Sequence, residues 1–246
     1  MTRRQRVDDL TMLALPEAPV LAPDGGEIVY VLKTVDEGAD RDTRSLWRVG
    51  TASGAPRRLT HGSADFAPAW SPDGKQVAFL RGADGPAQVW LLPMDGGDPE
   101  QLTTLPLGAG APAWSPDGTR IAFAAPVDLR AAPGEGDQDR ARRAARPVVT
   151  ERLDYRADGA GLFGTVRTHL HAVDVEARQC RQVTDGDWHA SAPSWSPDSA
   201  RLAFSATMAP NADLVFRSPA YVLDVTDPAA VPELAGLADG VCDSVT

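Results

Sequence analysis

The chain has 246 residues, of which 43% are hydrophobic and 24% are charged, a balance that predicts a globular protein with a sizeable core. The formal net charge of -10 argues against nucleic acid and anionic membranes as partners. No apolar run approaches the roughly 20 residues of a membrane-spanning helix. Two cysteines, Cys180 and Cys242, predict a reducing compartment, and Asp8 and Asp9 directly after the basic N-terminus argue against a cleavable signal. We therefore expect a cytoplasmic protein.

The chain opens with a lead-in over residues 1–18. Within it, residues 8–15 predict one or two helical turns that Pro16 ends. A first repeat follows at 19–62, and its polar segment at 36–43 predicts an exposed hairpin tip.

A Trp-Ser-Pro-Asp-Gly turn recurs at 67–79, 111–123 and 192–204, and a weaker copy without the tryptophan lies at 19–30. Serine accepts a backbone hydrogen bond, proline presets φ, and glycine takes the positive φ that closes the hairpin. Ser199 replaces the glycine in the last copy, so we expect strain there. Each tryptophan is large enough to fill the space between stacked units. The residues assigned to this structural signature are Trp70, Ser71, Pro72, Asp73, Gly74, Trp114, Ser115, Pro116, Asp117, Gly118, Trp195, Ser196, Pro197 and Asp198.

The strand after each turn is apolar on both faces. Val77 and Phe79 alternate onto one face, Ala78 between them is small and apolar, and the other copies repeat the pattern. A strand of this kind is covered on both sides, and small sheets stacked face to face around an axis form a β-propeller. The sequence therefore predicts an all-β fold, a β-propeller of four-stranded antiparallel blades.

The spacing of the turns divides the chain into blades. The turn aspartates lie 49, 44 and 81 positions apart, at Asp24, Asp73, Asp117 and Asp198. The first two intervals fit a blade of about 40–50 residues, and the third indicates an insertion. The boundaries that we expect are blades at 19–62, 67–108, 112–186 and 193–238, an insertion at 126–167, and the start of a further blade at 241–246. About four blades leave the ring incomplete.

The insertion is expected to be partly helical. Residues 138–146 predict a helix that a proline ends, and 147–150 and 153–155 predict strands that return to the sheet. The closing strands of the third blade are then expected at 169–174 and 180–184.

These repeats resemble the blades of TolB-like propellers and, more closely, the N-terminal propeller of the prolyl oligopeptidase family of serine peptidases, in its acylaminoacyl-peptidase-like branch. Three features carry the resemblance. A Leu-Thr-x-Gly or Val-Thr-x-Gly segment, at 59–62 and 183–186, precedes a tryptophan turn; the insertion contains the segment 148–159; and His-Leu-His-Ala-Val-Asp follows it at 169–174. The likeness covers the chain from about residue 8 onward.

The resemblance implies a role in gating. In that family a propeller, usually of seven or eight blades, sits over an α/β-hydrolase domain that carries the catalytic Ser, Asp and His, and the propeller limits which peptides enter. This chain has no Gly-x-Ser-x-Gly motif, so no triad can be assigned to it. We expect a non-catalytic propeller portion, inactive alone, whose partners are an α/β-hydrolase domain and short peptide substrates.

Two other functions stay open on the sequence alone. The first is a stand-alone TolB-like propeller that acts as a protein-interaction scaffold. The second is a non-functional truncated fragment, whose open blade edges would favour aggregation or dimerisation. The sequence does not set an oligomeric state.

Candidate metal sites favour a structural interpretation. His169 and His171 lie two apart on a predicted strand and share a face, but no Cys, Asp or Glu ligand pattern accompanies them. The acidic segments 95–98 and 185–187 lack the spacing of an EF-hand loop and predict hairpin turns. We therefore expect no metal and no cofactor.

Four residues are candidate contacts for a substrate or partner. Arg140, Arg143 and Arg146 form a basic cluster that could bind a carboxylate; the alternative is a solvated helix face on which Asp139 pairs with a nearby arginine. Trp188 follows the last strand of the third blade, where the loops at a propeller mouth lie.

Overall fold

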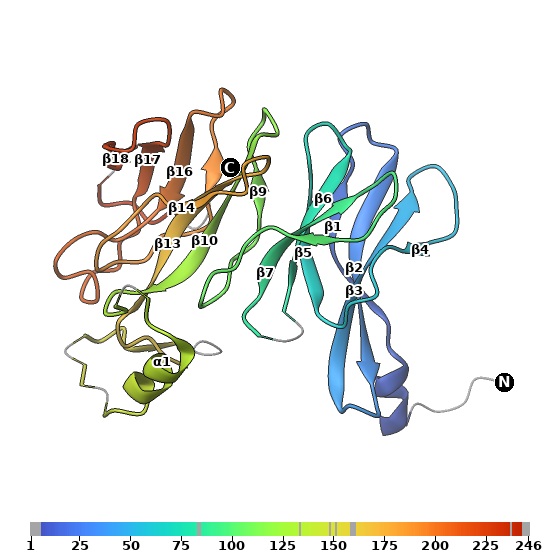
Figure 1. Cartoon of the computed structure of the whole chain (residues 1–246), viewed down its shortest axis with the longest axis horizontal. Coiled ribbons are helices and arrows are strands. Elements are labelled where there is room, and N and C mark those ends of the chain that lie inside the picture. Colours follow the sequence, from blue (N-terminus) through green and yellow to red (C-terminus); the bar gives the residue numbers. More distant parts are fainter. Residues whose placement is uncertain are drawn as a thin grey trace. The chain divides into compact units, whose positions relative to one another are not determined.

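The computed structural model describes residues 6–82, 85–132, 134–147, 149–150, 152–157, 161–236 and 238–242 (Figure 1). These residues form four antiparallel sheets of four strands each, one two-stranded sheet and one α-helix. The sheets confirm the predicted all-β fold of four-stranded blades. Most of the expected further blade at 241–246, residues 1–5 of the lead-in and parts of the segment 148–159 lie outside the described residues.

The chain divides into two compact units. One comprises Met1–Phe123, Ala172–Cys180 and Pro197–Ser199, and the other comprises Ala124–His171, Arg181–Ser196 and Ala200–Thr246. The helices in the described part of the chain are too short or too polar to cross a bilayer.

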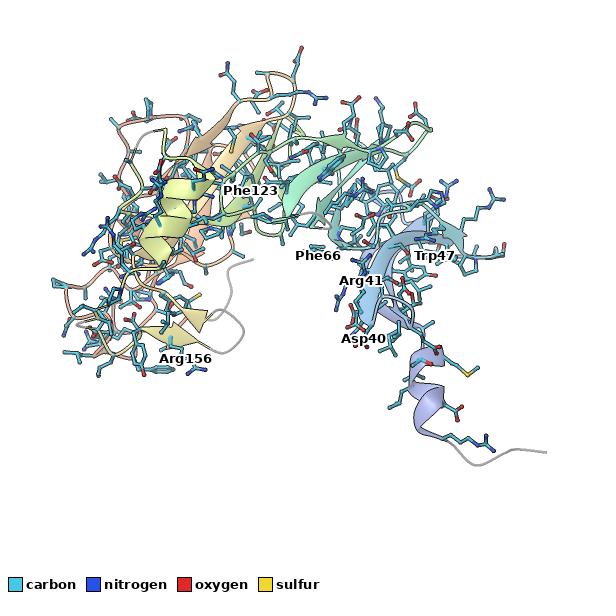
Figure 2. All side chains as sticks on the ribbon, turned by 60° about the horizontal axis from the view of Figure 1, so that its bottom comes forward. Asp40, Arg41, Trp47, Phe66, Phe123 and Arg156 are labelled. Carbon is cyan, nitrogen blue, oxygen red and sulfur yellow. The ribbon has the colours of Figure 1, made fainter. Side chains whose placement is uncertain are left out.

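The first sheet has the order β1-β2-β3-β4 and follows a short 3-10 helix, η1. The bounds are η1 Val7–Met12, β1 Leu15–Leu21, β2 Glu27–Asp36, β3 Arg41–Gly50 and β4 Arg57–Arg58. Strand β1 thus begins before the expected end of the lead-in at residue 18, and Pro16 lies inside it. The edge position of β1 explains this, because an edge strand tolerates a residue without an N–H. Asp40 and Arg41 lie at the exposed β2–β3 hairpin tip (Figure 2).

The second sheet has the order β5-β6-β7-β8. Its strands are β5 Asp65–Trp70, β6 Gln76–Arg81, β7 Gln88–Pro93 and β8 Glu100–Gln101. Val77, Ala78 and Phe79 of β6 are all fully buried, so this strand is covered on both faces as its sequence predicts. One apolar cluster joins the first two sheets and contains Val29, Val31, Leu46, Val77, Phe79 and Leu92, with Phe66 packed against it (Figure 2).

The third sheet has the order β14-β13-β10-β9, and its middle connection carries the insertion. The strands are β9 Ala113–Trp114, β10 Arg120–Asp128, β13 Val166–Asp174 and β14 Cys180–Gln182; the insertion holds α1 Asp137–Ala144, β11 Arg156–Ala157 and β12 Gly161–Leu162. The helix agrees with the sequence pattern. The strands expected at 147–150 and 153–155 are wrong for the residues described there, which are irregular. The apolar side chains that suggested strands, such as Val149 and Leu153, are exposed without a partner strand.

The fourth sheet has the order β15-β16-β17-β18. Its strands are β15 Ser194–Trp195, β16 Arg201–Ser205, β17 Ala220–Asp224 and β18 Glu233–Leu234. Leu202 and Phe204 of β16 are fully buried, like their counterparts Val77 and Phe79. The same apolar pair therefore anchors each later sheet.

Two repeat tryptophans link their sheets to the preceding one. The indole Nε1 of Trp70 donates to the backbone oxygen of Val20 at 3.2 Å. In the same way, Nε1 of Trp114 donates to the backbone oxygen of Ala69 at 3.1 Å. These rings lie between neighbouring sheets, where the sequence places them.

The Ser-Pro-Asp-Gly turns are held by their own side chains. Ser71 donates to Asp73 Oδ1 at 2.7 Å and accepts a hydrogen bond from the backbone N–H of Gln76 at 2.9 Å. Ser115 makes the matching contacts in the next turn. The hydrogen bond from Ser71 lowers the pKa of Asp73, so this carboxylate is ionised at neutral pH. Ser199, in the glycine position, has a φ of 60° and takes the left-handed conformation.

Candidate interaction site in the third and fourth sheets

A buried threonine fixes the polar cluster at the start of β13. The hydroxyl of Thr184 accepts a hydrogen bond from the backbone N–H of Leu170 at 2.9 Å. Thr60 and Thr103 do the same in the first two sheets, for Leu46 and Val89. Each threonine comes from a Leu-Thr or Val-Thr pair, and two of these pairs, at 59–60 and 183–184, belong to the segments that carry the family resemblance. This repeated pair was the signal for an anchor that we did not recognise from sequence.

His169 is fully buried, and both of its ring nitrogens have hydrogen-bond partners. Its Nε2 lies 2.9 Å from the backbone oxygen of Gly186, and its Nδ1 lies 3.2 Å from the hydroxyl of Thr184. Because a carbonyl only accepts, Nε2 carries the hydrogen and Nδ1 accepts from the threonine. Burial lowers the pKa of His169, which is therefore neutral at pH 7.

His171 supports the structural interpretation of this histidine pair. Its Nδ1 lies 3.2 Å from the backbone oxygen of His169, and burial lowers its pKa as well. No group of three or more metal-ligating side chains occurs among the described residues, the acidic turns 95–98 and 185–187 included.

Trp188 lies in this cluster, half-buried between the third and fourth sheets' side chains. Its ring stands edge-on to His169, with centroids 5.1 Å apart, and stacks on Phe204 at 6.0 Å and 10°. The loop geometry requires a glycine before it, because a Cβ at Gly186 would lie 2.4 Å from the indole nitrogen. Its contact with a substrate or partner stays a prediction.

Two arginine–aspartate pairs cover the cluster. Arg167, almost entirely buried, donates through Nε to Asp187 Oδ1 at 2.6 Å. Arg152 from the insertion binds Asp154 through two hydrogen bonds of 2.7 and 2.8 Å. The hydrogen bonds that Arg152 donates to Asp154 raise the pKa of Arg152 and lower that of Asp154, so both stay charged at neutral pH. Sequence reasoning missed both pairs: Arg167 and Asp187 are 20 residues apart, and Arg152 and Asp154, although close in sequence, carry no motif.

His189 completes the cluster. Its Nδ1 accepts from the backbone N–H of Thr168 at 3.1 Å, which leaves the hydrogen on Nε2. Burial, and next the positive charge of Arg167, lower its pKa. Phe163 of the insertion packs against its ring at a centroid distance of 5.1 Å.

Of the three arginines in the predicted basic cluster, Arg143 has carboxylate partners of its own. It binds Glu135 through hydrogen bonds of 3.0 and 2.5 Å and also pairs with Asp128. These carboxylates raise its pKa, Glu135 contributing most. Arg146 is exposed and Arg140 half-buried. Contact of these arginines with a partner stays a prediction, and the guanidinium of Arg143 already has an internal function: it ties α1 to the end of β10.

The histidine nitrogens at this site already have partners inside the protein. Both ring nitrogens of His169 and Nδ1 of His189 are held by backbone or threonine partners. What the site offers is paired charges beside a half-buried aromatic ring.

The first half of the chain matches the model of a known protein family. The model of the TolB beta propeller domain matches residues 2–131, more than half of the chain. The chain belongs to the TolB β-propeller domain family. This confirms the resemblance drawn from the tryptophan turns.

The relatives of this TolB-type chain include peptidases. The uncharacterized peptidase YuxL of Bacillus subtilis is 32% identical over 223 residues, which cover 88% of this chain and 33% of the relative. Dipeptidyl-peptidase 5 of Porphyromonas gingivalis is 34% identical over 70 residues, 28% of this chain and 10% of the relative. The chain thus spans about a third or less of the length of these relatives.

Solved structures share the fold. Pyrococcus horikoshii acylaminoacyl peptidase aligns with a TM-score of 0.70 at 15% identity, over 93% of this chain and 33% of that protein. TolB from Acinetobacter baumannii aligns with a TM-score of 0.56 at 17% identity, over 91% of this chain and 44% of that protein.

Proposed function

We propose that this TolB-type chain is the non-catalytic propeller portion of a prolyl-oligopeptidase-family serine peptidase, most similar to the acylaminoacyl-peptidase branch. In this proposal it admits short peptides to an α/β-hydrolase domain and excludes folded proteins. The alignment of 88% of the chain with one third of a bacterial peptidase carries the proposal. The lack of a Gly-x-Ser-x-Gly motif supports a role that is not catalytic for these 246 residues.

A chimera with the Bacillus relative tests the gate. The aligned segment of that peptidase is replaced by this chain, and a second variant lacks the segment altogether. A panel of aminoacyl and acetyl-aminoacyl p-nitroanilides reports cleavage of small substrates, and native ribonuclease A reports cleavage of a folded protein. We expect the chimera to cleave only the small substrates and the deletion variant to cleave both. Equal cleavage of the folded protein by the two would contradict gating.

The second candidate is a stand-alone TolB-like interaction scaffold, which the fold shared with TolB supports. Intact mass spectrometry on the native polypeptide, captured with an antibody to this segment, separates the two. A mass of 26.0 kDa favours the scaffold, and a much larger mass favours the peptidase. We also propose a cytoplasmic location; the small number of cysteines, two in 246 residues, supports it, and cell fractionation with the same antibody tests it.

A further inference from the structure

The Ser-Pro-Asp-Gly turns stack on one another along the chain. Side chains fill the space between the turns at 115–118 and 196–199 but not the space between those at 71–74 and 115–118. A Cβ placed on Gly74 would contact Pro23 of the preceding turn at 3.8 Å, and one on Gly118 would contact Pro72 at 3.7 Å. Each glycine thus lies over the proline of the turn before it. We call the space between two successive turns a seam.

The seam between the turns at 115–118 and 196–199 is closed by side chains. The hydroxyl of Ser199 accepts a hydrogen bond from the backbone N–H of Asp117 at 3.0 Å. Arg120 donates through Nη2 to the backbone oxygen of Ser199 at 2.5 Å. A serine in the glycine position and an arginine five residues after the turn serine therefore fill this seam.

The seam between the turns at 71–74 and 115–118 lacks both groups. In the repeat, Gln76 corresponds to Arg120, and Gly118 corresponds to Ser199. Because Gln76 is shorter than an arginine and Gly118 has no side chain, a cleft of about 470 Å³ remains between these turns. Its lining residues are Ser71, Pro72, Asp73, Lys75, Gln76, Trp114, Pro116, Asp117 and Gly118.

The lining of this open seam has a definite chemistry. Trp114 is half-buried and its indole N–H is engaged with Ala69, so the ring itself forms part of the wall. Two exposed prolines continue the apolar surface, and the carboxylates of Asp73 and Asp117 flank it. Lys75 is the one cationic group of the lining; its side chain is 81% exposed, with Nζ 3.6 Å from Asp73.

We propose that the open seam is a binding site for an arginine side chain of an extended peptide. A guanidinium is planar and weakly hydrated, so it stacks on an aromatic ring while its N–H groups reach carboxylates. The flanking methylenes of arginine match the prolines. The acidic pair and the net charge of -10 make the surface complementary to a basic segment. This site is independent of the gating function proposed above.

Binding of a short peptide to the full chain tests the proposal. The probe is acetyl-Ala-Ala-Arg-Ala-Ala-amide, and the matched control replaces arginine by citrulline, which keeps the shape and removes the charge. The indole N–H resonance of Trp114 reports occupancy, assigned by a Trp114→Phe variant. We expect saturable binding of the arginine peptide and about tenfold weaker binding of the citrulline peptide, the effect of roughly one cation–π contact and ion pair.

The neighbouring seam supplies the blocking variant. Gln76→Arg with Gly118→Ser transplants the residues that close the other seam. The 3.7 Å contact at Gly118 leaves room for a Cβ, and although its φ of +72° strains any side chain, Ser199 adopts a φ of 60° at the matching position. We expect this variant to keep its far-UV circular dichroism and to lose arginine-peptide binding. Lys75→Glu, at an exposed position, is expected to tighten binding about fivefold by changing the local charge.

Three results would overturn the site: equal affinity for the citrulline peptide, undiminished binding by the folded double variant, or unchanged or weaker binding by Lys75→Glu. If the double variant does not fold, the Lys75→Glu variant and the citrulline peptide still test whether the open seam binds arginine.

Discussion

The second and third sheets share a buried threonine that holds a strand N–H, but its side-chain neighbour differs between the two sheets. In the second sheet the hydroxyl of Thr103 accepts from Val89 N–H and donates to the side-chain oxygen of Gln88 at 2.8 Å. In the third, Thr184 holds Leu170 in the same way, but its neighbour is His169. The repeat therefore fixes the hydrogen bond between the threonine hydroxyl and the backbone N–H. The residue before that backbone N–H varies: it is Gln88, a neutral amide, in the second sheet and His169, a titratable ring, in the third.

The two sheets also place their charges differently. The second sheet keeps its main ion pair inside itself, with Asp65 fully buried and bound by Arg81 through bonds of 2.6 and 2.9 Å. Arg81 in turn lies over the ring of Trp90, 4.7 Å from its centroid. The third sheet relies on the Arg167 pair with Asp187, a residue whose side chain is largely exposed. We expect the second sheet to depend more strongly on its ion pair.

The largest effect should come from Asp65→Ala. It removes a buried carboxylate and leaves Arg81 without its bidentate partner, so we expect the free energy of unfolding to fall by about 3 kcal/mol. Urea denaturation measures the change, and Asp98→Ala, at an exposed turn, serves as the control with a change below about 0.5 kcal/mol. Similar losses for the two variants would show that the buried pair contributes little.

Thr184→Val and Thr103→Val probe the shared anchor. Valine keeps the shape of threonine but leaves a buried backbone N–H unsatisfied and removes the contact to the neighbouring side chain, so each variant should lose about 2 kcal/mol. Hydrogen exchange at Leu170 and Val89 should accelerate in the matching variant alone. An exchange rate at Leu170 unchanged by Thr184→Val would refute the anchor in the third sheet.

His169→Gln makes the third sheet resemble the second. The pKa of His169 is lowered below the unfolded value of 6.5, so below that pH the unfolded chain binds more protons and stability falls as pH falls. His171 and His189 act in the same direction. Between pH 7 and pH 5.5 we expect the variant to lose about 1 kcal/mol less stability than the wild type, in paired urea titrations. An identical pH dependence would mean that the pKa of His169 is the same in the folded and unfolded chain.

Arg143→Met should give the smallest global change. It releases α1 from Asp128 and Glu135, so we expect faster cleavage of the insertion in limited proteolysis while the urea midpoint stays nearly constant. Arg142→Ala is the matched control, since that side chain is 77% exposed. Equal cleavage rates for the two variants would argue against the tie.

Sequence could predict the parts of the fold that repeat. The tryptophan turns, the Val77 and Phe79 alternation and the insertion helix all depend on local chemistry, and local chemistry is visible in a single chain. The pairing of Asp65 with Arg81 was not visible, because they meet only through the register of β5 and β6, and that of Arg167 with Asp187 was not visible, because a loop after β14 brings Asp187 back to β13. The strands expected around Val149 failed for a related reason: β-branched residues favour an extended backbone, but only a partner makes it a strand.

The candidate site was predicted only in part. Trp188 was selected by its place in the chain, and the structure shows it against His169 and Phe204. The arginines of α1 were selected by charge alone, and charge does not reveal that Arg143 already has two carboxylate partners.

The tryptophan hydrogen bonds between sheets give the chain a direction of assembly. Trp70 finds its acceptor 50 residues earlier, at Val20, and Trp114 finds its acceptor 45 residues earlier, at Ala69. During synthesis the acceptor strand leaves the ribosome before the donor does. We therefore expect the second and third sheets each to meet a template that is already complete, so that the chain can fold from its N-terminal side without waiting for later repeats.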